Sequence, residues 1–421
     1  MKIWIVQTGE PLHCDEDSPR PMRAMNLANI AVRLGHEVTI ISSRFYHQKK
    51  EHRKIVNDEI NISRKLKIIL IDSPGYNSNL SLSRLWDHFV LALNLNKKIK
   101  KLSPKPDIVF IGFPPMEIGY VMSKWLYTKS IPFIVDVKDQ WPSFIVSSLP
   151  KLIRPFARMI LHPYFYISKK TMNTATGITT MANAFLKWAE KFSQRSTNDF
   201  NKVVPLTSKV EAVSPEEMEI ARQWAQNVGI TGDKLRVMFL GSHYPSLNFD
   251  HIFYASENLN KLGFECEFII CGKGQLTDEI KVKSKNNKNI ILTGWVDRPK
   301  INAIAEKCSL SIAPFRNIDN YTSNLPNKII DYLSLGLPIL SPLEGELSSL
   351  ISKYNVGYKY DENDLTTLHE GIIKIFYEKK INQMRINSLQ TYKSLFDFDT
   401  TYEGLVRHLE KIYEIKKNNS Q

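Results

Sequence analysis

Hydrophobic and polar positions alternate along the first half of the chain with two different periods. Short apolar runs such as Lys2–Gln7 predict buried strands, whereas Pro21–Leu34 has the three- and four-residue apolar spacing of a helix. Strands that alternate with helices predict an α/β fold with a doubly wound parallel sheet and helices on both faces. The remaining predicted strands are Glu37–Ser42, Ile68–Asp72, Asp107–Gly112, Ile131–Val137 and Gly177–Thr180, and the remaining predicted helices are Leu82–Leu102, Met116–Thr128 and Ala182–Lys191.

The same alternation starts again after a polar stretch, which places the domain boundary within about Lys202–Asp233. We predict one Rossmann-like domain at residues 1–205, a second at 206–385, and C-terminal helices at 386–421 that return toward the first domain. Open parallel sheets bind ligands outside the carboxyl ends of their strands, so ligand is expected in a cleft between the domains. The second set of predicted strands is Leu235–Leu240, Cys266–Cys271, Ile290–Thr293, Leu310–Pro314 and Pro338–Leu340, and its helices are Asp250–Leu262, Leu276–Ser284 and Lys300–Lys307.

Composition and charge exclude several classes. The 56 Lys and Arg residues exceed the 43 Asp and Glu residues, but they are scattered and form no recognisable nucleic-acid module, so no nucleic-acid partner is expected. No apolar run reaches the ~18–20 residues of a membrane-spanning helix, and no signal peptide is recognisable, so we expect a cytoplasmic protein. The cysteines lack metal-binding spacing, and Cys266 and Cys271 are predicted to be reduced core residues.

The most informative stretch is Ser323–Leu340. A polar loop leads into a predicted helix that has Pro326 in its first turn and ends at Gly336. Lys328 and Asp331 are three residues apart and share one face of this helix. Free N–H groups at a helix start favour phosphate, and a nearby carboxylate can hold a ribose diol, so the stretch outlines a nucleotide site.

This stretch also resembles the signature of the family-4 retaining glycosyltransferases, which have the GT-B fold of two Rossmann-like domains. The phrase that begins at Asp331, Asp-Tyr-Leu-Ser-Leu-Gly-Leu-Pro-Ile-Leu, matches the family's Glu-Tyr-Met-Ala-x-Gly-x-Pro-Val-Val, with aspartate in place of glutamate. The first acidic position of the pattern falls on Ser323, followed by Asn324. The resemblance implies ribose binding by Asp331 and donor contacts at Ser323 and Asn324, and it leaves the sugar-contacting role of Ser323 open.

Three turns after predicted strands also match the family's donor site. The resemblance implies that a diphosphate lies near Gly241 and Ser242, where relatives usually have a basic residue. Because this chain has Ser242 and His243 there, the phosphate charge needs Lys328 or another cation. The other implied donor-binding residues are Gly272, Gly274, Gly294 and Val296, and the alternative for these motifs is ordinary turns or packing.

In the first domain, the stretch from Ile134 to Pro142 resembles the Val-x-Asp-Leu-Trp-Pro phrase of the branch that builds surface polysaccharides. The match implies that Asp139 is catalytic, as a group that orients an acceptor hydroxyl, takes its proton or contacts the donor sugar. Trp141 and Gly9 are expected to contact the acceptor. The alternative for Asp139 is a strand-end carboxylate that caps a turn.

Arg23 matches an arginine common in the same branch, and the resemblance implies that it stabilises the leaving diphosphate as a metal ion does elsewhere. No metal or other cofactor is therefore expected. A solvated arginine at a helix start is the alternative. His36, in the family's Gly-His-Glu-Val phrase, is expected to be structural because it begins a strand away from the cleft.

Basic and bulky apolar residues interleave in Lys151–Tyr166. Such a stretch can lie on an anionic membrane surface, which would suit a lipid-linked acceptor and a peripheral location at the inner face of the membrane. The alternative is a helix packed on the first domain with its basic face in water.

The resemblance implies a retaining, metal-independent glycosyltransferase of cell-surface polysaccharide synthesis. It would move a hexose or N-acetylhexosamine from a nucleotide-sugar donor to a saccharide acceptor, with the acceptor on the first domain and the donor on the second. The residues leave two alternative functions open. One is a nucleotide-sugar epimerase on the same fold, and the other is a non-catalytic nucleotide-binding relative.

Overall fold

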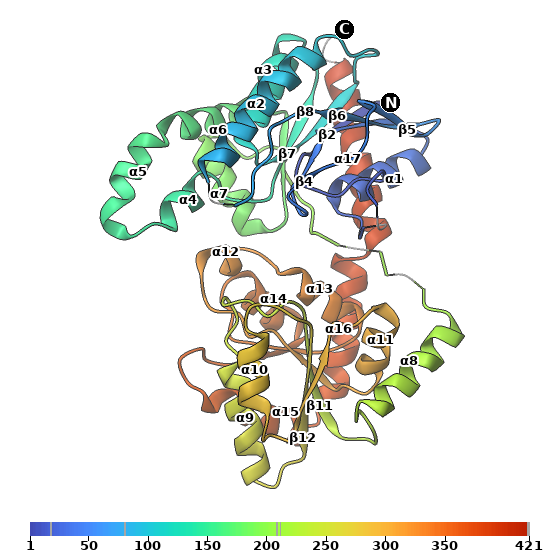
Figure 1. Cartoon of the computed structure of the whole chain (residues 1–421), viewed down its shortest axis with the longest axis vertical. Helices are drawn as coiled ribbons and strands as arrows, with labels where there is room; N and C mark the ends of the chain where they lie inside the picture. Colours follow the sequence, from blue (N-terminus) through green and yellow to red (C-terminus); the bar gives the residue numbers. More distant parts are fainter. Residues whose placement is uncertain (17–18, 80, 208, 211, 419–421) are drawn as a thin grey trace. The chain divides into compact units, whose positions relative to one another are not determined.

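The computed structural model describes residues 1–16, 19–79, 81–207, 209–210 and 212–418. The chain forms two compact units. The first contains Met1–Ser208 and Phe398–Gln421, and the second contains Lys209–Asp397. Each unit is an α/β structure with its own sheet (Figure 1).

The first unit is built on an eight-stranded sheet with the order β10-β9-β8-β7-β1-β2-β6-β5. All neighbouring strands are parallel except β5, which pairs antiparallel with β6 at the sheet edge. A separate two-stranded ribbon joins β3 and β4. The strands are β1 (Lys2–Val6), β2 (Glu37–Ser43), β3 (Phe45–Tyr46), β4 (Glu51–His52), β5 (Glu59–Ser63), β6 (Leu66–Ile71), β7 (Ile108–Phe113), β8 (Phe133–Val137), β9 (Gly177–Thr180) and β10 (Lys202–Val203).

Side chains of successive strand residues point to opposite faces, so one apolar strand serves two cores. Ile3 and Ile5 of β1 pack with α1 (Arg23–Arg33) and α17 (Phe398–Asn418). Trp4 and Val6 pack on the other face with four further helices. These are α2 (Leu82–Ile99), α3 (Met116–Thr128), α6 (His162–Thr174) and α7 (Asn183–Ser193).

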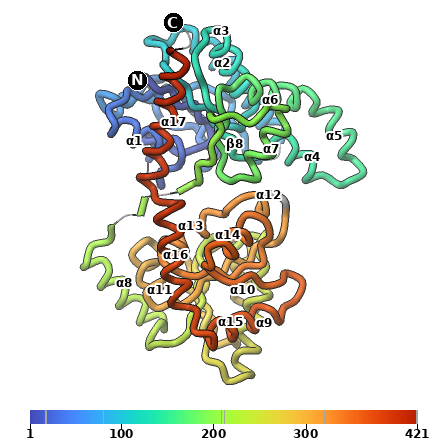
Figure 2. Tube along the Cα trace, turned by 180° about the vertical axis from the view of Figure 1, so that it is seen from behind, coloured from blue at the N-terminus to red at the C-terminus, as the bar shows by residue number. Residues whose placement is uncertain are grey.

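The C-terminal helix α17 is an integral part of the first unit, where it packs along α1 (Figure 2). His36 joins the two ends of the chain, because its ring nitrogens contact the amino group of Met1 at 3.2 Å and Oε1 of Glu410 at 2.8 Å. The expected structural role of His36 is thereby confirmed. Helix α16 (Ile381–Leu395) packs on α13 (Asn327–Ser334) in the second unit, so only α17 of the segment 386–421 belongs to the first.

The second unit has a six-stranded parallel sheet with the order β13-β12-β11-β14-β15-β16. Its strands are β11 (Leu235–Leu240), β12 (Cys266–Cys271), β13 (Ile290–Gly294), β14 (Leu310–Ile312), β15 (Ile339–Ser341) and β16 (Gly357–Lys359). Helices α8 (Pro215–Asn227), α9 (Asp250–Lys261), α10 (Thr277–Ser284), α11 (Arg298–Glu306), α12 (Asp319–Thr322), α14 (Glu346–Tyr354) and α15 (Thr366–Tyr377) complete this unit.

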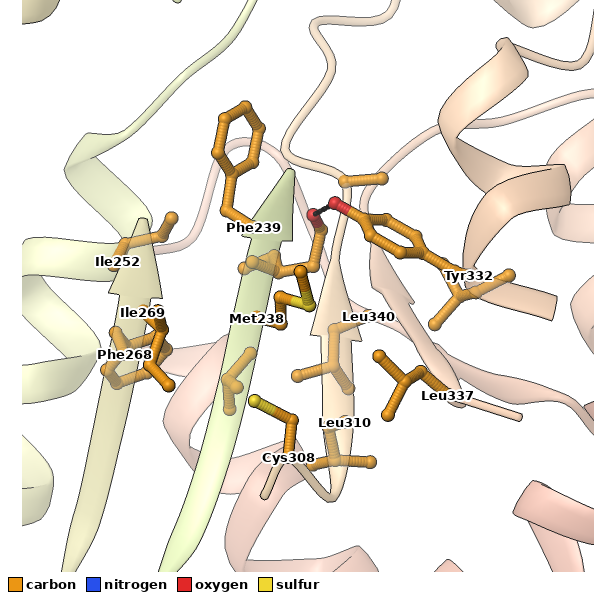
Figure 3. Packing of buried hydrophobic residues seen from close by; sticks show 14 of the residues in the cluster. Met238, Phe239, Ile252, Phe268, Ile269, Cys308, Leu310, Tyr332, Leu337 and Leu340 are labelled. Carbon is orange, nitrogen blue, oxygen red and sulfur yellow. Dashed lines mark hydrogen bonds between the residues drawn. The ribbon is translucent and has the colours of Figure 1, made fainter. Parts of the chain in front are cut away.

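A buried tyrosine fixes α13 against the sheet of the second unit. The hydroxyl of Tyr332 donates to the Ile312 carbonyl at 3.0 Å (Figure 3). The same hydroxyl accepts from the Leu240 N–H at 2.8 Å. Both partners lie at the carboxyl ends of their strands, β14 and β11. Tyr332 therefore holds the helix that carries Lys328 and Asp331 at that edge of the sheet.

The structure agrees with the expected α/β class and with most predicted elements, and the short strands β3, β4, β5, β10 and β16 are additional. Cys266 and Cys271 are buried and free, as expected, and burial raises the pKa of the Cys271 thiol to about 12. Among the described residues, no helix combines the length and hydrophobicity needed to cross a membrane.

Three buried charges and the half-buried Lys138 organise the first unit around the carboxyl ends of β1 and β8. The Arg23 guanidinium, 1% exposed, lies 3.4 Å from the Asp136 carboxylate and donates to the Val204 carbonyl at 2.6 Å. Lys138 forms an ion pair with Glu10, whose other oxygen accepts from a backbone N–H at the start of α1 at 2.8 Å. Each positive charge is thus matched by a carboxylate, which is what makes the burial of charge tolerable.

Removing one member of this network leaves a buried charge without a partner, which costs about 3–5 kcal/mol. We predict that Arg23→Gln lowers the free energy of unfolding of the first unit by that amount, measured by chemical denaturation. Arg33→Gln is the matched control, because Arg33 also lies on α1 but pairs with Asp399 and Glu403 at the surface. That exposed set is worth about 0–1 kcal/mol. Equal losses for the two variants would contradict the assigned role of the network.

Candidate functional site

In the second unit, the turns that follow β11, β12 and β13 lie side by side. The Gly241 N–H donates to the Cys271 carbonyl at 3.1 Å, and the Gly272 N–H donates to the Gly294 carbonyl at 2.7 Å. The His243 N–H donates to the Lys273 carbonyl at 3.2 Å. The predicted donor residues Gly241, Ser242, Gly272, Gly274 and Gly294 therefore belong to one surface at the carboxyl edge of the sheet.

Glycine is required at Gly272 by the close approach of the neighbouring turn. Its φ of +125° is rarely adopted by other residues, and a Cβ there would overlap the Gly241 carbonyl oxygen. The reason for glycine at this position is therefore backbone packing inside the protein. This packing keeps the β11 turn, with the exposed side chain of Ser242, in a fixed shape.

Lys328 lies directly against the β11 turn. A Cβ placed on Gly241 would be 3.2 Å from its Nζ, and the ammonium lies 4.3 Å from the ring centre of Phe239 and 4.8 Å from that of Phe315. No carboxylate lies within 4.0 Å of Lys328 among the residues described here. Desolvation lowers the pKa of this lysine to about 7. Lys328 is thus a cation poised for an anion beside Gly241.

The start of α13 adds backbone donors to the same region. Its N-cap residue, Pro326, offers no side chain that could accept a hydrogen bond, so the first N–H groups of the helix are not capped by it. Uncapped helix N–H groups and the positive end of the helix dipole favour phosphate. Asp331 lies one turn further along the same helix and is half-buried.

His243 is a residue whose role sequence reasoning left undeveloped. Its ring is buried, with Nδ1 3.0 Å from Thr277 Oγ1 and with Nε2 lacking a hydrogen-bond partner among the described residues. Burial and the nearby charge of Lys328 lower its pKa, so the imidazole is neutral near pH 7. The sequence signal was its place two residues after the strand, next to the glycine.

The other residues predicted to bind the donor are Val296, Ser323 and Asn324. Val296 is buried in the core, while the neighbouring Trp295 is 70% exposed, which excludes core packing for that tryptophan. Ser323 and Asn324 are half-buried in the segment between α12 and α13. Asn324 uses its side-chain oxygen to accept from the Leu325 N–H at 2.8 Å.

The first unit contains a pocket of about 340 Å³ at the carboxyl ends of its strands. Gly9 follows β1, and Lys138 and Asp139 follow β8, so two of the predicted residues line this pocket. Sequence reasoning did not identify the rest of the lining. It comes from the segment between β1 and α1, from residues 43–48 around β3, from the β6–α2 loop and α2, and from the turn before α3. Prominent among these residues are Phe45, His47, Tyr76, Arg84, Asp87 and His88.

Asp139 has the properties of a group that exchanges protons. Burial raises its pKa to about 6, and the charges of Lys138 and Arg84 oppose that rise. The carboxylate is therefore largely ionised at neutral pH and can still accept a proton. No contact that would make Asp139 a turn cap is present among the described residues.

Two predicted residues are not part of the pocket lining. Trp141 is 8% exposed, and the Arg84 guanidinium covers its ring at 4.8 Å from the centre. Arg23 is committed to the Val204 and Pro205 carbonyls and to Asp136. This burial differs from the expectation of an arginine that contacts the donor phosphates, because the guanidinium has no open side for a ligand. The difference arises from partners more than 100 residues away in sequence.

The fold is that of the GT-B glycosyltransferases. Sucrose-phosphate synthase from Thermosynechococcus elongatus aligns with a TM-score of 0.68 at 10% identity, over 98% of this chain and 99% of that one. WaaG, a glycosyltransferase involved in lipopolysaccharide biosynthesis, aligns with a TM-score of 0.62 at 13% identity, over 97% and 99%. Anabaena HepE, solved with UDP and glucose, aligns with a TM-score of 0.60 at 12% identity, over 98% and 100%.

A sequence match points to the same class. Residues 234–377 match the family model described as glycosyl transferases group 1. They lie within the second unit and include the turns after β11, β12 and β13 as well as Lys328. No curated protein sequence matches the chain. The match over the second unit and the GT-B fold both point to the glycosyltransferase class.

The lowered pKa of Lys328 predicts a pH-dependent affinity for a nucleotide-sugar. Below pH 7 the free lysine is already charged, whereas above pH 7 binding must first protonate it. We expect the affinity for UDP-glucose, measured by isothermal titration calorimetry, to fall by up to tenfold per unit between pH 7.5 and 9, with proton uptake on binding. UDP-glucose has no phosphate monoester that would titrate near pH 6 and confuse the result.

Lys328→Met keeps much of the side-chain volume and removes the charge. This variant should bind about 10–100-fold more weakly at pH 7, the worth of a charge-assisted hydrogen bond, and should lose the pH dependence. If the wild-type protein and Lys328→Met bind UDP-glucose with the same affinity and the same pH profile, Lys328 does not contact the phosphates.

Proposed function

We propose that the protein is a retaining glycosyltransferase of family-4 type, with the donor bound by the second unit and the acceptor by the first. The observation that carries the proposal is Lys328, a desolvated cation without a carboxylate partner among the described residues, set against the Gly241 turn at a helix start. A diphosphate is the ligand that such a site fits best, because it brings negative charge to the lysine and acceptor oxygens to the N–H groups.

The proposed roles of the residues follow from the charges that develop as the bond to the donor sugar breaks. As the bond between the anomeric carbon and the diphosphate oxygen breaks, negative charge grows on the diphosphate and positive charge on the sugar. Lys328 and the start of α13 stabilise the first of these. The acceptor hydroxyl forms the new bond to the anomeric carbon, and its proton leaves, to the departing diphosphate or to Asp139. In this proposal Asp331 holds the ribose, and Ser242, Gly274 and Gly294 lie along the donor.

The donor is proposed to be a hexose or N-acetylhexosamine nucleotide, and the acceptor a saccharide that is carried on a lipid. Gly9 would line the acceptor site, and Trp141 would shape it from beneath Arg84. No metal is proposed, since Lys328 and backbone N–H groups can supply the positive charge. Within the described residues, no three His, Cys, Asp or Glu side chains gather as metal ligands would.

An exposed apolar surface on residues 151–160 supports the proposal that the protein binds to a membrane surface. The segment η1 (Lys151–Ile153) and the helix α5 (Arg154–Ile160) contain no buried residue. Leu152 is 92% exposed and Phe156 62% exposed, so the packed-helix alternative does not describe these side chains. Bulky apolar groups held in water on a helical segment are typical of proteins that insert into a lipid interface.

The positive charge of the same region favours binding to an anionic lipid surface. Residues 140–189 contain six Lys and Arg residues and neither Asp nor Glu. Each basic residue near an anionic bilayer contributes about 1 kcal/mol to binding. We therefore propose a peripheral protein that acts at the anionic inner face of the membrane, where a lipid-linked acceptor would be found.

The catalytic assignment of Asp139 is tested by kinetics. With a preparation that transfers sugar, Asp139→Asn should lower kcat by about 10²–10⁴-fold and leave the affinity for the nucleotide-sugar unchanged. The wild-type rate should fall below about pH 6, where Asp139 takes up its proton, and this limb should vanish in the variant. Turnover is measured as nucleoside diphosphate released, and the anomeric configuration of the product by NMR.

An unchanged kcat in Asp139→Asn would remove this residue from the mechanism. A product of inverted configuration would remove the retaining assignment. Conversion of the nucleotide-sugar to an epimer without any acceptor would favour the epimerase alternative.

The membrane proposal predicts binding to vesicles that contain phosphatidylglycerol and no binding to vesicles of phosphatidylcholine alone, measured by co-sedimentation. The double variant Leu152→Glu, Phe156→Glu should lose most of this binding without loss of stability, because both side chains are exposed. Val282→Glu is the control, since Val282 is 75% exposed in the second unit. Equal binding by the double variant and the control would exclude this surface.

A further inference from the structure

Two cations share one tyrosine ring on the wall of the first-unit pocket. The Lys50 ammonium lies 4.6 Å from the centre of the Tyr76 ring, and the Arg84 guanidinium lies 5.5 Å from it. Lys50 donates to His47 Nδ1 at 3.0 Å and to Asn79 Oδ1 at 2.5 Å. Arg84 donates from Nη1 to the Asn79 carbonyl at 2.9 Å, and its buried Nε has no hydrogen-bond partner among the described residues.

Neither cation forms an ion pair with a carboxylate in the part of the chain that the structure describes. No carboxylate oxygen lies within 4.0 Å of Lys50 or Arg84 there. Of the carboxylates in the lining, Glu10 pairs with Lys138, and Asp87 accepts from the Gly75 N–H at 2.7 Å. Asp139 acts on Arg84 through its charge and makes no ion pair with it.

Nearby buried cations follow the opposite rule. Arg53, which stacks on Tyr46, forms an ion pair with Asp15 at 2.5 Å, and both side chains are nearly inaccessible. Lys138, in the lining of the pocket itself, is paired with Glu10. These two cations are neutralised within the chain, whereas Lys50 and Arg84 lie against Tyr76, a residue of the pocket lining, without an ion-pair partner among the described residues.

The repulsion between these groups is visible in their neighbours. Burial and the charges of Lys50 and Arg84 lower the pKa of His47 to about 4. Burial and the charge of Arg84 also lower the pKa of Lys50. Two like charges at the edge of one pocket are unfavourable unless an anion joins them.

We propose that Lys50 and Arg84 form a subsite for an anionic group of the acceptor, a phosphate or a carboxylate. Arg84 suits this task because its planar fork can bind two oxygens at once, and Lys50 supplies a second point charge. This inference rests on the proposed function, since it names the substrate class of the acceptor pocket. The acceptor would be a sugar phosphate, a phosphate-linked carrier or an acidic sugar, rather than a neutral saccharide.

The test uses the full-length protein with the Lys328→Met substitution, so that the donor site holds phosphate only weakly. Glucose 1-phosphate, glucuronate and glucose are titrated by calorimetry at constant ionic strength. We expect at least one acidic probe to bind at least tenfold more tightly than glucose. Preference for glucose 1-phosphate indicates a phosphate source, and preference for glucuronate indicates an acidic sugar.

Arg84→Gln in the same background should abolish the preference for the acidic probe. Lys97→Gln is the matched control, because Lys97 is an exposed cation on the same helix, and it should retain the preference. If Arg84→Gln does not fold, Lys50→Gln gives the same test with a side chain on a different segment.

Equal binding of acidic and neutral probes, or an acid preference that survives both substitutions, would overturn the proposal. Its failure is distinct from failure of the proposed function. Binding of a nucleotide-sugar by the protein with Lys328 intact tests the donor site, and that binding does not involve Lys50 or Arg84.

Discussion

A charge that leaves water must find another partner, and this constraint explains both the architecture and the candidate sites of the molecule. Three cations that help to hold the fold together are neutralised by carboxylates of the chain. Arg23 lies beside Asp136, Lys138 pairs with Glu10, and Arg236 pairs with Glu267 at 2.8 Å. Without these carboxylates the same side chains would destabilise the fold by several kcal/mol.

Against this background the unmatched cations are informative. Lys328 lies between two aromatic rings at the edge of the second sheet, and Arg84 lies on Trp141 and Tyr76 in the first-unit pocket. Both cations lie against aromatic rings and form no ion pair among the described residues, an arrangement that an anionic ligand would complete. The donor diphosphate and an anionic acceptor group are the counter-ions that the proposed reaction supplies.

Local patterns were sufficient to predict much of the fold and part of the donor site. Apolar runs and helical spacing located β11, β12, α3 and β9 with their observed bounds or nearly so, because burial repeats every two or 3.6 residues. Lys328 could be predicted as a ligand contact because Pro326 marks a helix start and Lys328 and Asp331 share one face of that helix. These features depend on residues close in sequence.

The remainder depends on contacts between distant segments, which one sequence does not display. Arg23 is buried because Asp136 and Val204 come to it from distant parts of the chain. The pocket is lined by segments that are likewise far apart in sequence, such as Gly9, Arg84 and Asp139. Helices α16 and α17 adjoin in sequence and belong to different units. The short edge strand β5 escaped prediction because its side chains are mostly exposed and carry little apolar pattern.

The most direct test of the account is thermal stabilisation of the full-length protein by a panel of nucleotide-sugars and free nucleoside diphosphates. The account predicts that at least one nucleotide-sugar raises the Tm, and that Asp331→Ala abolishes this shift while Asp139→Asn retains it. Failure of every ligand to raise the Tm, or an undiminished shift in Asp331→Ala, would contradict a donor site on α13.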